Sequence, residues 1–500
     1  MSDDGPSGLR GAIVELRERL LVAEALHQDA ITAVAPTHRE SARNLVHYAA
    51  LRSTDLTDLQ RRLTQAGLSS LGRSESAVLG SVDAVLDVLL RLDGGPWPTD
   101  RPRSPLTLAA ARELQAAHTR AILSSPPERR RAEIMVTMPA HAASDPGLTV
   151  AMVAAGLDCA RVDCAHGDPE EWGATIANVR DAARGCGRIV RIYMDLGGSK
   201  IRTGAVPLGG VRLRRGDTIL LTRELGPDRP VGRGSDGRLR HAPRIGCTVP
   251  DVLRRADVGQ PVWLDDGHVA GVVTGCAVDH LEVTIARTPR GGHQLRPNNG
   301  VNMPDTDLGV SALTWADRRA LPFVVGHADM VGLSFVQRPQ DVLDLRAELD
   351  ALGGERVATV VKVESRRAVD DLPAILLAAM RGPAVGVMIA RGDLAVECGW
   401  ERLAEVQEDL LSLSEAAHAP VIWAAQVLEG LARTGLPSRA EISDAALAER
   451  AECVMLDEGS RVVDAIRLLD QILERMQHRQ LKRRTLLPEH EPWARFAVGG

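Results

Sequence analysis

Charged side chains stand at the ends of two apolar segments in the second half of the chain. Lys362 and Glu364 close the segment 359–364, and Gly392 and Asp393 follow the run 385–390. Residues two apart on a strand point to the same face, so Lys362 and Glu364 are expected side by side. A cation and two carboxylates at neighbouring strand ends suit a divalent ion and a phosphate-bearing anion. Gly392, which has no side chain, lets a ligand approach the backbone closely.

A simpler alternative is that two buried strands end in solvent-exposed charges. That alternative explains either segment alone, but it does not explain why both segments carry complementary charges at the same end. We therefore treat Lys362, Glu364 and Asp393 as the centre of a predicted active site.

The elements that must position these residues alternate between strand and helix patterns from residue 131 onward. Eight strands alternating with helices predict a parallel (β/α)8 barrel, a TIM barrel, whose active site forms at the C-terminal ends of the strands. The predicted strands are 133–137, 159–163, 189–194, 330–335, 359–363, 385–389, 421–424 and 453–456.

Other patterns flank or interrupt the predicted barrel. Residues 1–130 repeat apolar positions at helical spacing and show no catalytic grouping, which predicts an N-terminal helical domain for docking or oligomerisation. The barrel is expected over 131–205 and 299–480, and short β-rich runs predict an inserted small β-barrel lid domain over 206–298. Residues 481–500 are expected to form a tail, too short for a further domain of at least ~50 residues.

Bulk properties exclude several classes of protein. The net charge of −6 gives no general attraction to nucleic acid, and no apolar run reaches the ~18 residues of a membrane span. The N-terminus lacks the pattern of a secretion signal, and the seven cysteines form no CxxC pair. We therefore expect a cytoplasmic protein with reduced thiols, no membrane contact and no nucleic-acid partner.

The charged segments, together with others in the same order along the chain, resemble the pyruvate kinase family. The resemblance covers about residues 131–475, and it implies a TIM barrel with a mobile lid inserted after the third strand. The matching motifs are Lys362-Val-Glu364, Met388-Ile-Ala-Arg-Gly-Asp-Leu-Ala395, Ala160-Arg161 with His166-Gly167, Asp195 with Ile201-Arg202-Thr203-Gly204, Gly300-Val-Asn-Met-Pro304, Leu333-Ser-Phe-Val336 and Pro437-Ser-Arg-Ala-Glu441.

The resemblance also implies a role for each matching position. Lys362 stabilises charge on the transferring phosphoryl group and the enolate. Glu364 and Asp393 hold Mg²⁺ or Mn²⁺. The remaining implied roles are the substrate phosphate at Arg161, a further catalytic cation at Arg202, the substrate carboxylate at Gly392, Asp393 and Ala425, and nucleotide contacts at His166 and Asn299.

Several positions depart from the family pattern. Asn299 stands where the family has a lysine that contacts the nucleotide, and Ala425 stands where it has a threonine near the substrate carboxylate. In the family a potassium ion lies beside the substrate phosphate, but Ala165 removes one of its ligands. Lys200 stands five residues beyond Asp195 in place of a glutamate, and family members with that lysine work without potassium.

The ammonium of Lys200 is therefore predicted to lie near Asp163 and Asp195, where it relieves the repulsion between two carboxylates. On this reasoning K⁺ is not required. The expected activity is phosphoryl transfer from phosphoenolpyruvate to ADP, giving pyruvate and ATP, in a protein that can form a homo-oligomer. Two alternatives stay open: a barrel enzyme that uses the same metal centre on another phosphoryl or oxo-acid substrate, and a non-catalytic binding protein.

Overall fold

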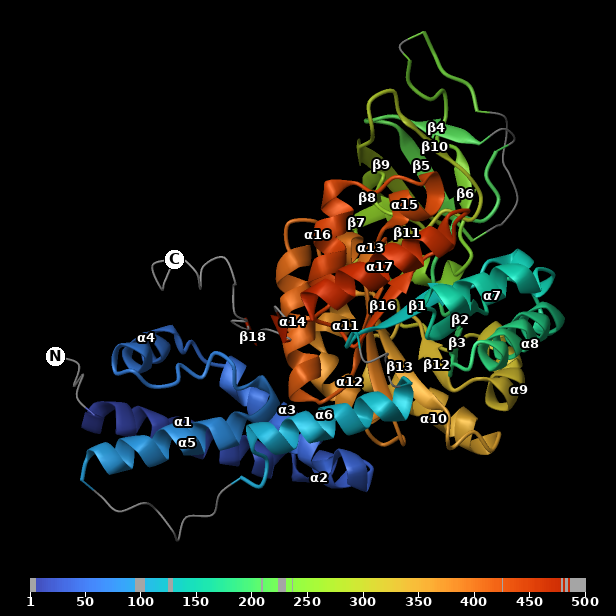
Figure 1. Ribbon diagram of the computed structural model, residues 1–500. Coiled ribbons are helices and arrows are strands. Elements are labelled where there is room, and N and C mark those ends of the chain that lie inside the picture. The colour runs from blue at the N-terminus through green and yellow to red at the C-terminus, as the bar shows by residue number, and fades with distance from the viewer. Residues whose placement is uncertain are drawn as a thin grey trace, which may run out of the picture.

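A closed barrel of eight parallel strands forms the centre of the protein in the computed structural model (Figure 1). The structure describes residues 6–94, 104–124, 129–207, 210–223, 231–235, 237–424, 426–477, 480–481 and 484–485. Strand order around the barrel follows the chain, and the last strand closes against the first through the pairs Glu133↔Cys453 to Val136↔Leu456. The predicted fold class, a TIM barrel with an inserted β lid and a helical N-terminal extension, is confirmed.

The barrel strands agree closely with the predicted segments. They are β1 (Glu133–Thr137), β2 (Cys159–Asp163), β3 (Arg191–Asp195), β12 (Met330–Leu333), β13 (Ala358–Val363), β14 (Val385–Ala390), β15 (Val421–Ala424) and β16 (Cys453–Leu456). Every residue of β13 and β14 is buried, as expected for parallel strands covered on both faces. β12 ends two residues before the prediction, because Phe335 adopts a φ of 54° that turns the chain out of the strand.

Helices cover the outside of the barrel between successive strands. They are α7 (Pro146–Ala155), α8 (Pro169–Gly185), α9 (Trp315–His327), α10 (Pro339–Ala351), α11 (Arg366–Asp370), α12 (Leu372–Ala379), α13 (Arg391–Glu397), α14 (Leu403–Ala416), α15 (Glu429–Thr434), α16 (Arg439–Ala448) and α17 (Val462–Met476). Ser438 and Glu441 form a reciprocal cap at the start of α16, so this family motif stabilises a helix end. Among the described residues, no helix is long and apolar enough to cross a membrane.

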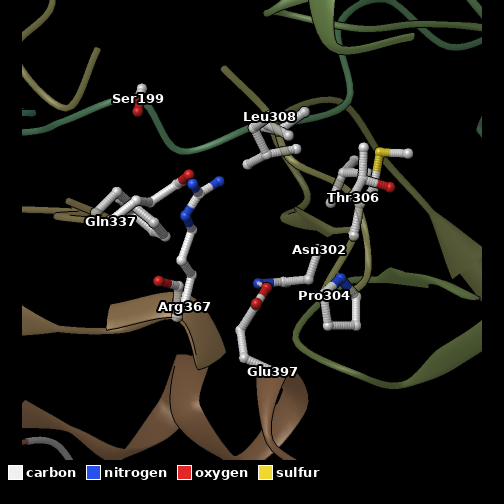
Figure 2. Close-up of a pocket in the computed structure, with 13 residues that line it drawn as sticks. Ser199, Asn302, Pro304, Thr306, Leu308, Gln337, Arg367 and Glu397 are labelled. Atoms are coloured by element: carbon white, nitrogen blue, oxygen red, sulfur yellow. Dashed lines mark hydrogen bonds between the residues drawn. The ribbon is translucent and has the colours of Figure 1, made fainter. Parts of the chain in front are cut away.

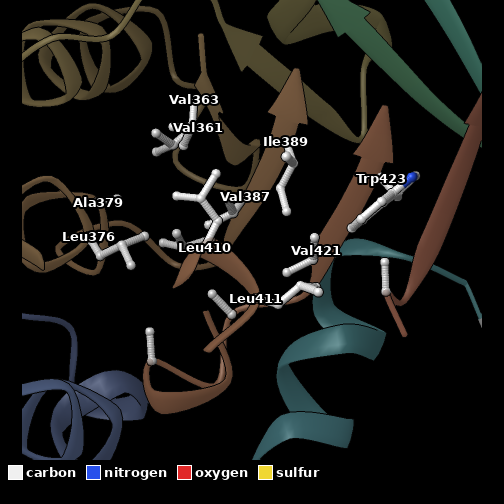
Figure 3. Packing of buried hydrophobic residues seen from close by; sticks show 14 of the residues in the cluster. Val361, Val363, Leu376, Ala379, Val387, Ile389, Leu410, Leu411, Val421 and Trp423 are labelled. Carbon is white, nitrogen blue, oxygen red and sulfur yellow. The ribbon is translucent and has the colours of Figure 1, made fainter. Parts of the chain in front are cut away.

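The main core lies between the barrel strands and these helices. Val361 and Val363 of β13, Val387 and Ile389 of β14, and Val421 of β15 point outward (Figure 3). Figure 3 shows them facing side chains of α12 and α14, including those of Leu376, Leu410 and Leu411. These side chains are all under 4% exposed, so the helices fix the direction in which each strand ends.

The insertion after β3 forms a lid at one end of the barrel. Its strands are β4 (Val211–Leu213), β5 (Thr218–Thr222), β6 (Arg244–Gly246), β7 (Pro261–Leu264), β8 (Val269–Cys276), β9 (His280–Arg287), β10 (His293–Leu295) and β11 (Val301–Asn302). Six of them make one sheet in the order β11-β7-β8-β9-β5-β6, in which only the β5–β6 pair is parallel. β11 pairs with β7, so Asn302 is the last lid residue before the chain returns to the barrel.

A bundle of helices precedes the barrel and lies at the end away from the lid (Figure 1). It comprises α1 (Pro6–Leu26), α2 (Gln28–Ala33), α3 (Arg39–Arg52), α4 (Thr57–Gln65), α5 (Val78–Leu92) and α6 (Leu108–Ile122). Buried polar groups join the bundle to the end of α14. The Asn44 side chain donates to the carbonyl of Ala416 (2.8 Å), and the ring of His418 contacts the Ser41 hydroxyl (3.0 Å).

The last turn of α6 closes the floor of the barrel. Ile122 and Leu123 belong to the same buried cluster as Met135, Tyr193 and Met388, which point into the barrel. A Cβ placed on Gly386 of β14 would lie 3.2 Å from the Ile122 Cδ1 atom, so the Ile122 side chain packs directly against the strand. The extension therefore contributes side chains to the barrel interior.

Replacing Ile122 with alanine tests whether α6 closes the barrel. Ile122 is 2% exposed, so Ile122→Ala should leave a cavity and lower the free energy of unfolding by about 2–5 kcal/mol. The matched control is Leu26→Ala on α1, where the side chain is 78% exposed and a change within about 0.5 kcal/mol is expected. Chemical denaturation of both variants gives the comparison. Equal effects would show that α6 does not close the barrel.

Candidate active site

The carboxylate of Asp195 lies at the centre of a charged cluster at the C-terminal ends of the strands. Asp195 ends β3 and is 1% exposed. Its Oδ2 atom accepts hydrogen bonds from Arg161 Nε at 2.8 Å and from Lys362 Nζ at 3.0 Å. Its Oδ1 atom accepts a hydrogen bond from the Tyr193 hydroxyl at 3.0 Å. The predicted cations on β2 and β13 therefore meet on one buried anion.

Lys362 links this anion to the predicted metal carboxylate. Besides Asp195, its ammonium donates to the Ser334 hydroxyl at 2.7 Å and lies 3.2 Å from Glu364 Oε1. The second Glu364 oxygen accepts the backbone N–H of Phe335 at 2.6 Å. The left-handed turn at Phe335 thus aims an amide at Glu364 and fixes that carboxylate in place.

A glycine makes room for the cluster. Gly332 lies on β12, between β3 and β13, and pairs with Asp195 in the sheet. A Cβ at Gly332 would lie 1.8 Å from the Tyr193 hydroxyl and 2.5 Å from Asp195 Oδ1. No larger residue fits there, so Gly332 is required for Lys362 to reach across to Asp195.

The charges in the cluster support one another. Burial alone would raise the pKa of Asp195, but Lys362 and Arg161 outweigh burial and hold it below its ordinary value. Burial likewise opposes the charge on Lys362, yet the carboxylates of Asp195 and Glu364 raise its pKa well above the usual value. Both side chains therefore remain charged around neutral pH, and the site presents fixed cations.

Lys200 lies elsewhere than predicted. Its Nζ atom is 2.9 Å from Asp393 Oδ1 and 3.7 Å from Asp266 Oδ1 on a lid turn. Burial opposes its charge, but Asp393 and Asp266 raise its pKa. This corrects the expected pairing with Asp163 and Asp195. Arg161 and Lys362 already neutralise Asp195, whereas the cation that pairs with Asp393 is Lys200, at the entry to the lid.

The two predicted metal ligands lie close enough to influence each other. Burial raises the pKa of Glu364, Lys362 lowers it in part, and the carboxylate of Asp393 raises it again. A divalent cation held by both would remove that repulsion, and oxygen ligands of this kind are those that Mg²⁺ prefers. In the described ranges, no group of three or more His, Cys, Asp or Glu side chains is placed to hold a metal ion.

Other predicted residues surround the cluster at various distances. Asp163 accepts the backbone N–H of Ala165 at 2.9 Å and lies 3.3 Å from Arg161. Arg202 lies at the lid root, the place where the chain enters and leaves the lid. Its guanidinium donates there to the Asn298 carbonyl at 3.1 Å. A Cβ at Gly392 would meet no atom within 4 Å, so the space before this backbone is open. Ala425 lies outside the described residues.

The two predicted nucleotide residues differ in their freedom to bind a ligand. His166 lines a cavity of about 340 Å³ beside the ends of β1 and β2, with Thr137, Pro139 and Trp172. The Asn299 side chain is already engaged, since it donates to Asp265 and accepts the backbone N–H of Arg296 at 2.7 Å. The cavity at His166 is therefore open to a ligand, whereas Asn299 serves the lid turn.

Three residues of the cluster were not singled out from the sequence as site residues. Tyr193 lies two residues before Asp195 on the same strand, so alternation alone places it on the same face. Ser334 and Phe335 fall in a recognised motif, but nothing in their types signals contacts to Lys362 and Glu364. The rarity of lysine is a signal that could have pointed to the contacts of this site. The chain has three lysines among its 60 basic residues, and two of them, Lys200 and Lys362, lie in the site.

Comparison with protein families agrees with this arrangement. The family model described as pyruvate kinase, barrel domain, matches residues 129–461. The chain belongs to the pyruvate kinase family. The matched range starts just before β1 and includes the lid and all the cluster residues described above.

Individual pyruvate kinases are similar over the same region. The protein from Geobacillus stearothermophilus is 32% identical over 365 residues, which cover 71% of this chain and 59% of that protein. A pyruvate kinase from Mycobacterium tuberculosis is 33% identical over 354 residues, 69% of this chain and 70% of that one. This chain thus spans less than two thirds of the Geobacillus relative.

A solved pyruvate kinase structure shares the fold. The crystal structure from Cryptosporidium parvum superposes with a TM-score of 0.61 at 24% identity, over 70% of this chain and 69% of that chain. At that identity the likeness to this pyruvate kinase structure concerns the fold.

Proposed function

We propose that this protein acts as a pyruvate kinase in glycolysis. It would transfer the phosphoryl group of phosphoenolpyruvate to ADP, forming ATP and leaving an enolate that takes up a proton to become pyruvate. The observation that carries the proposal is the position of Lys362, whose ammonium lies between the carboxylates of Asp195 and Glu364 at the mouth of the barrel.

In this proposal the chain contributes fixed charge and orientation. Arg161, held by Asp195, would bind the substrate phosphate, and Lys362 would stabilise charge on the phosphoryl group and on the enolate. The backbone at Gly392 and Asp393, together with Ala425, would receive the substrate carboxylate. The nucleotide would occupy the cavity beside His166, with Arg202 and Asn299 at the lid root.

Glu364 and Asp393 would hold Mg²⁺ or Mn²⁺, which when bound supplies a Lewis acid for carbonyl and phosphoryl oxygens. The lid would close over the site and exclude water. We propose the predicted division of the chain at residues 130, 205 and 480, with the predicted lid boundary at 298 moved to 302 because β11 pairs with β7. A cytoplasmic location and the ability to self-associate are parts of the same hypothesis.

One observation favours a second candidate. Because the Asn299 side chain is committed to Asp265, the lid root offers the nucleotide less than a lysine would. An enzyme that passes the phosphoryl group to another acceptor, or that acts on an oxo-acid, would tolerate this change. Pyruvate formation from phosphoenolpyruvate with each nucleoside diphosphate in turn separates the two candidates.

Replacing Lys362 tests the proposed chemistry. Lys362→Met should lower kcat for pyruvate formation by about 100-fold or more, since it removes a preorganised charge. Arg402→Met, at a side chain that is half exposed and paired with Glu405, is the control and should keep normal turnover. Circular dichroism verifies that both variants fold. Near-normal turnover in Lys362→Met would rule out the role proposed for this lysine.

Metal binding provides an independent test. Asp393→Ala should weaken Mn²⁺ binding by more than the roughly 10- to 100-fold that follows loss of an outer-shell partner. Paramagnetic relaxation of water protons measures the affinity directly, without turnover. Asp350→Ala, a half-exposed carboxylate on α10, should leave it unchanged. If Asp393→Ala binds Mn²⁺ as tightly as the parent protein, the metal site lies elsewhere.

We also expect activity without K⁺. Arg161 and Lys362 already neutralise Asp195, and Lys200 places a tethered ammonium beside Asp393, so both of these carboxylates have a cation without K⁺. Assays in tetramethylammonium buffer, with and without KCl at matched ionic strength, should give equal rates. Lys200→Glu should lower activity, and added K⁺ should restore little because Ala165 offers no ligand. Strong activation of the parent protein by K⁺ would contradict this expectation.

A further inference from the structure

A small cavity lies between the root of the lid and the barrel (Figure 2). Its volume is about 40 Å³, enough for a few water molecules. Figure 2 shows Asn302 of the lid beside Glu397 of α13, with Gln337 and Arg367 on the far side of the cavity. None of these side chains belongs to the charged cluster around Asp195.

One hydrogen bond crosses this cavity from the lid to the barrel. The side-chain amide of Asn302 donates to Glu397 Oε1 at 2.9 Å. Asn302 is the last residue of β11, and Glu397 lies one helical turn after Asp393 on α13. The bond therefore joins the lid sheet to the helix that carries the proposed metal carboxylate.

The polar atoms of this pair are unequally satisfied. Asn302 is 4% exposed, and its Oδ1 atom has no hydrogen-bond partner among the described residues. An ionised carboxylate can only accept hydrogen bonds, so a charged Glu397 cannot itself supply a donor to that buried oxygen. A neutral carboxylic acid has one donor and one acceptor, which match the acceptor and donor of a carboxamide.

We propose that Glu397 is held as a neutral acid whose O–H donates to Asn302 Oδ1, so that a two-bond acid–amide pair latches the lid to α13. In this role Glu397 is a positioning residue, because it acts through Asn302 and α13. The latch goes beyond the proposed phosphotransfer and does not depend on it. It would hold the lid root and Asp393 in a fixed relation while the pair is intact.

The surroundings of Glu397 favour the neutral form. Burial raises its pKa, the Asn302 amide lowers it, and the carboxylate of Asp393 raises it again, to about 7 overall. The backbone N–H of Arg366 at the start of α11 and the ammonium of Lys200 also lower it, but Lys200 is already paired with Asp393. Arg367 lines the same cavity with its guanidinium 2.6 Å from Asp307.

The direction of the pH effect follows from this raised pKa. An acid whose pKa is higher in the folded protein stabilises the fold fully below its unfolded value of 4.5, and that contribution is lost as pH rises through about 7. Above neutrality Glu397 becomes a second carboxylate near Asp393 and the O–H donor disappears. The lid root should therefore loosen as pH rises through neutrality.

Hydrogen exchange of the full-length protein, corrected for intrinsic rates, tests the latch. With a pKa of about 7, the protonated fraction of Glu397 falls from about 90% to about 10% between about pH 6 and pH 8, so opening at β7, β11 and α13 should increase several-fold. Glu397→Gln keeps one acceptor and gains a permanent donor. Hydrogen exchange at β7, β11 and α13 of this variant, corrected for intrinsic rates, should therefore not change with pH. The control Glu401→Gln, at an exposed glutamate four residues on, should behave as the parent protein.

A second measurement covers the case in which Glu397→Gln fails to fold. Infrared difference spectra of the parent protein should show a protonated carboxyl band that disappears as pH rises through neutrality, and Asn302→Leu should shift or remove it. Burial raises the pKa of Glu133 to about 8, so the Asn302 variant is needed to assign the band. The latch is wrong if Glu397→Gln opens with pH as the parent protein does, or if Asn302→Leu leaves every protonated carboxyl band unchanged. Neither readout involves turnover, so the latch and the proposed enzyme activity can fail separately.

Discussion

The buried carboxylate of Asp195 is the contact on which the rest of the active site depends. A charge removed from water must be compensated at close range, and here Arg161 on β2 and Lys362 on β13 supply the compensation. These strands are not neighbours of one another, and β12 separates β3 from β13. The contact exists only because Gly332 leaves space on β12, so one absent side chain governs the position of two catalytic candidates.

Much of the architecture was predictable because parallel barrels have a strong sequence signal. Buried strands such as β14 read as unbroken apolar runs, and their ends are marked by charge, which placed Lys362, Glu364 and Asp393 together. The end of β12 was missed because a left-handed residue such as Phe335 leaves no mark in the sequence. The pairing of Lys200 with Asp393 was not predicted, because it depends on how the chain entering the lid lies against α13. The spacing of residues in the sequence carries no information on that arrangement.

Both crossings between the barrel and the lid contact α13. Lys200, at the first crossing into the lid, bonds to Asp393 at the start of this helix, and Asn302, at the second crossing, bonds to Glu397 at its end. A lid turn adds Asp266 beside Lys200. These contacts tie the lid to a seven-residue helix that carries a proposed metal ligand, so a change in lid position would act on the metal site.

The floor of the barrel bears on how this chain can change over evolutionary time. The recognisable family region begins at residue 129, yet Ile122 and Leu123 fill space inside the barrel and belong to its core. A change on either side of this contact, in the extension or in the barrel strands, alters the packing of one shared core. Exchange of the extension as a separate unit would therefore require matching changes in the strands that it closes.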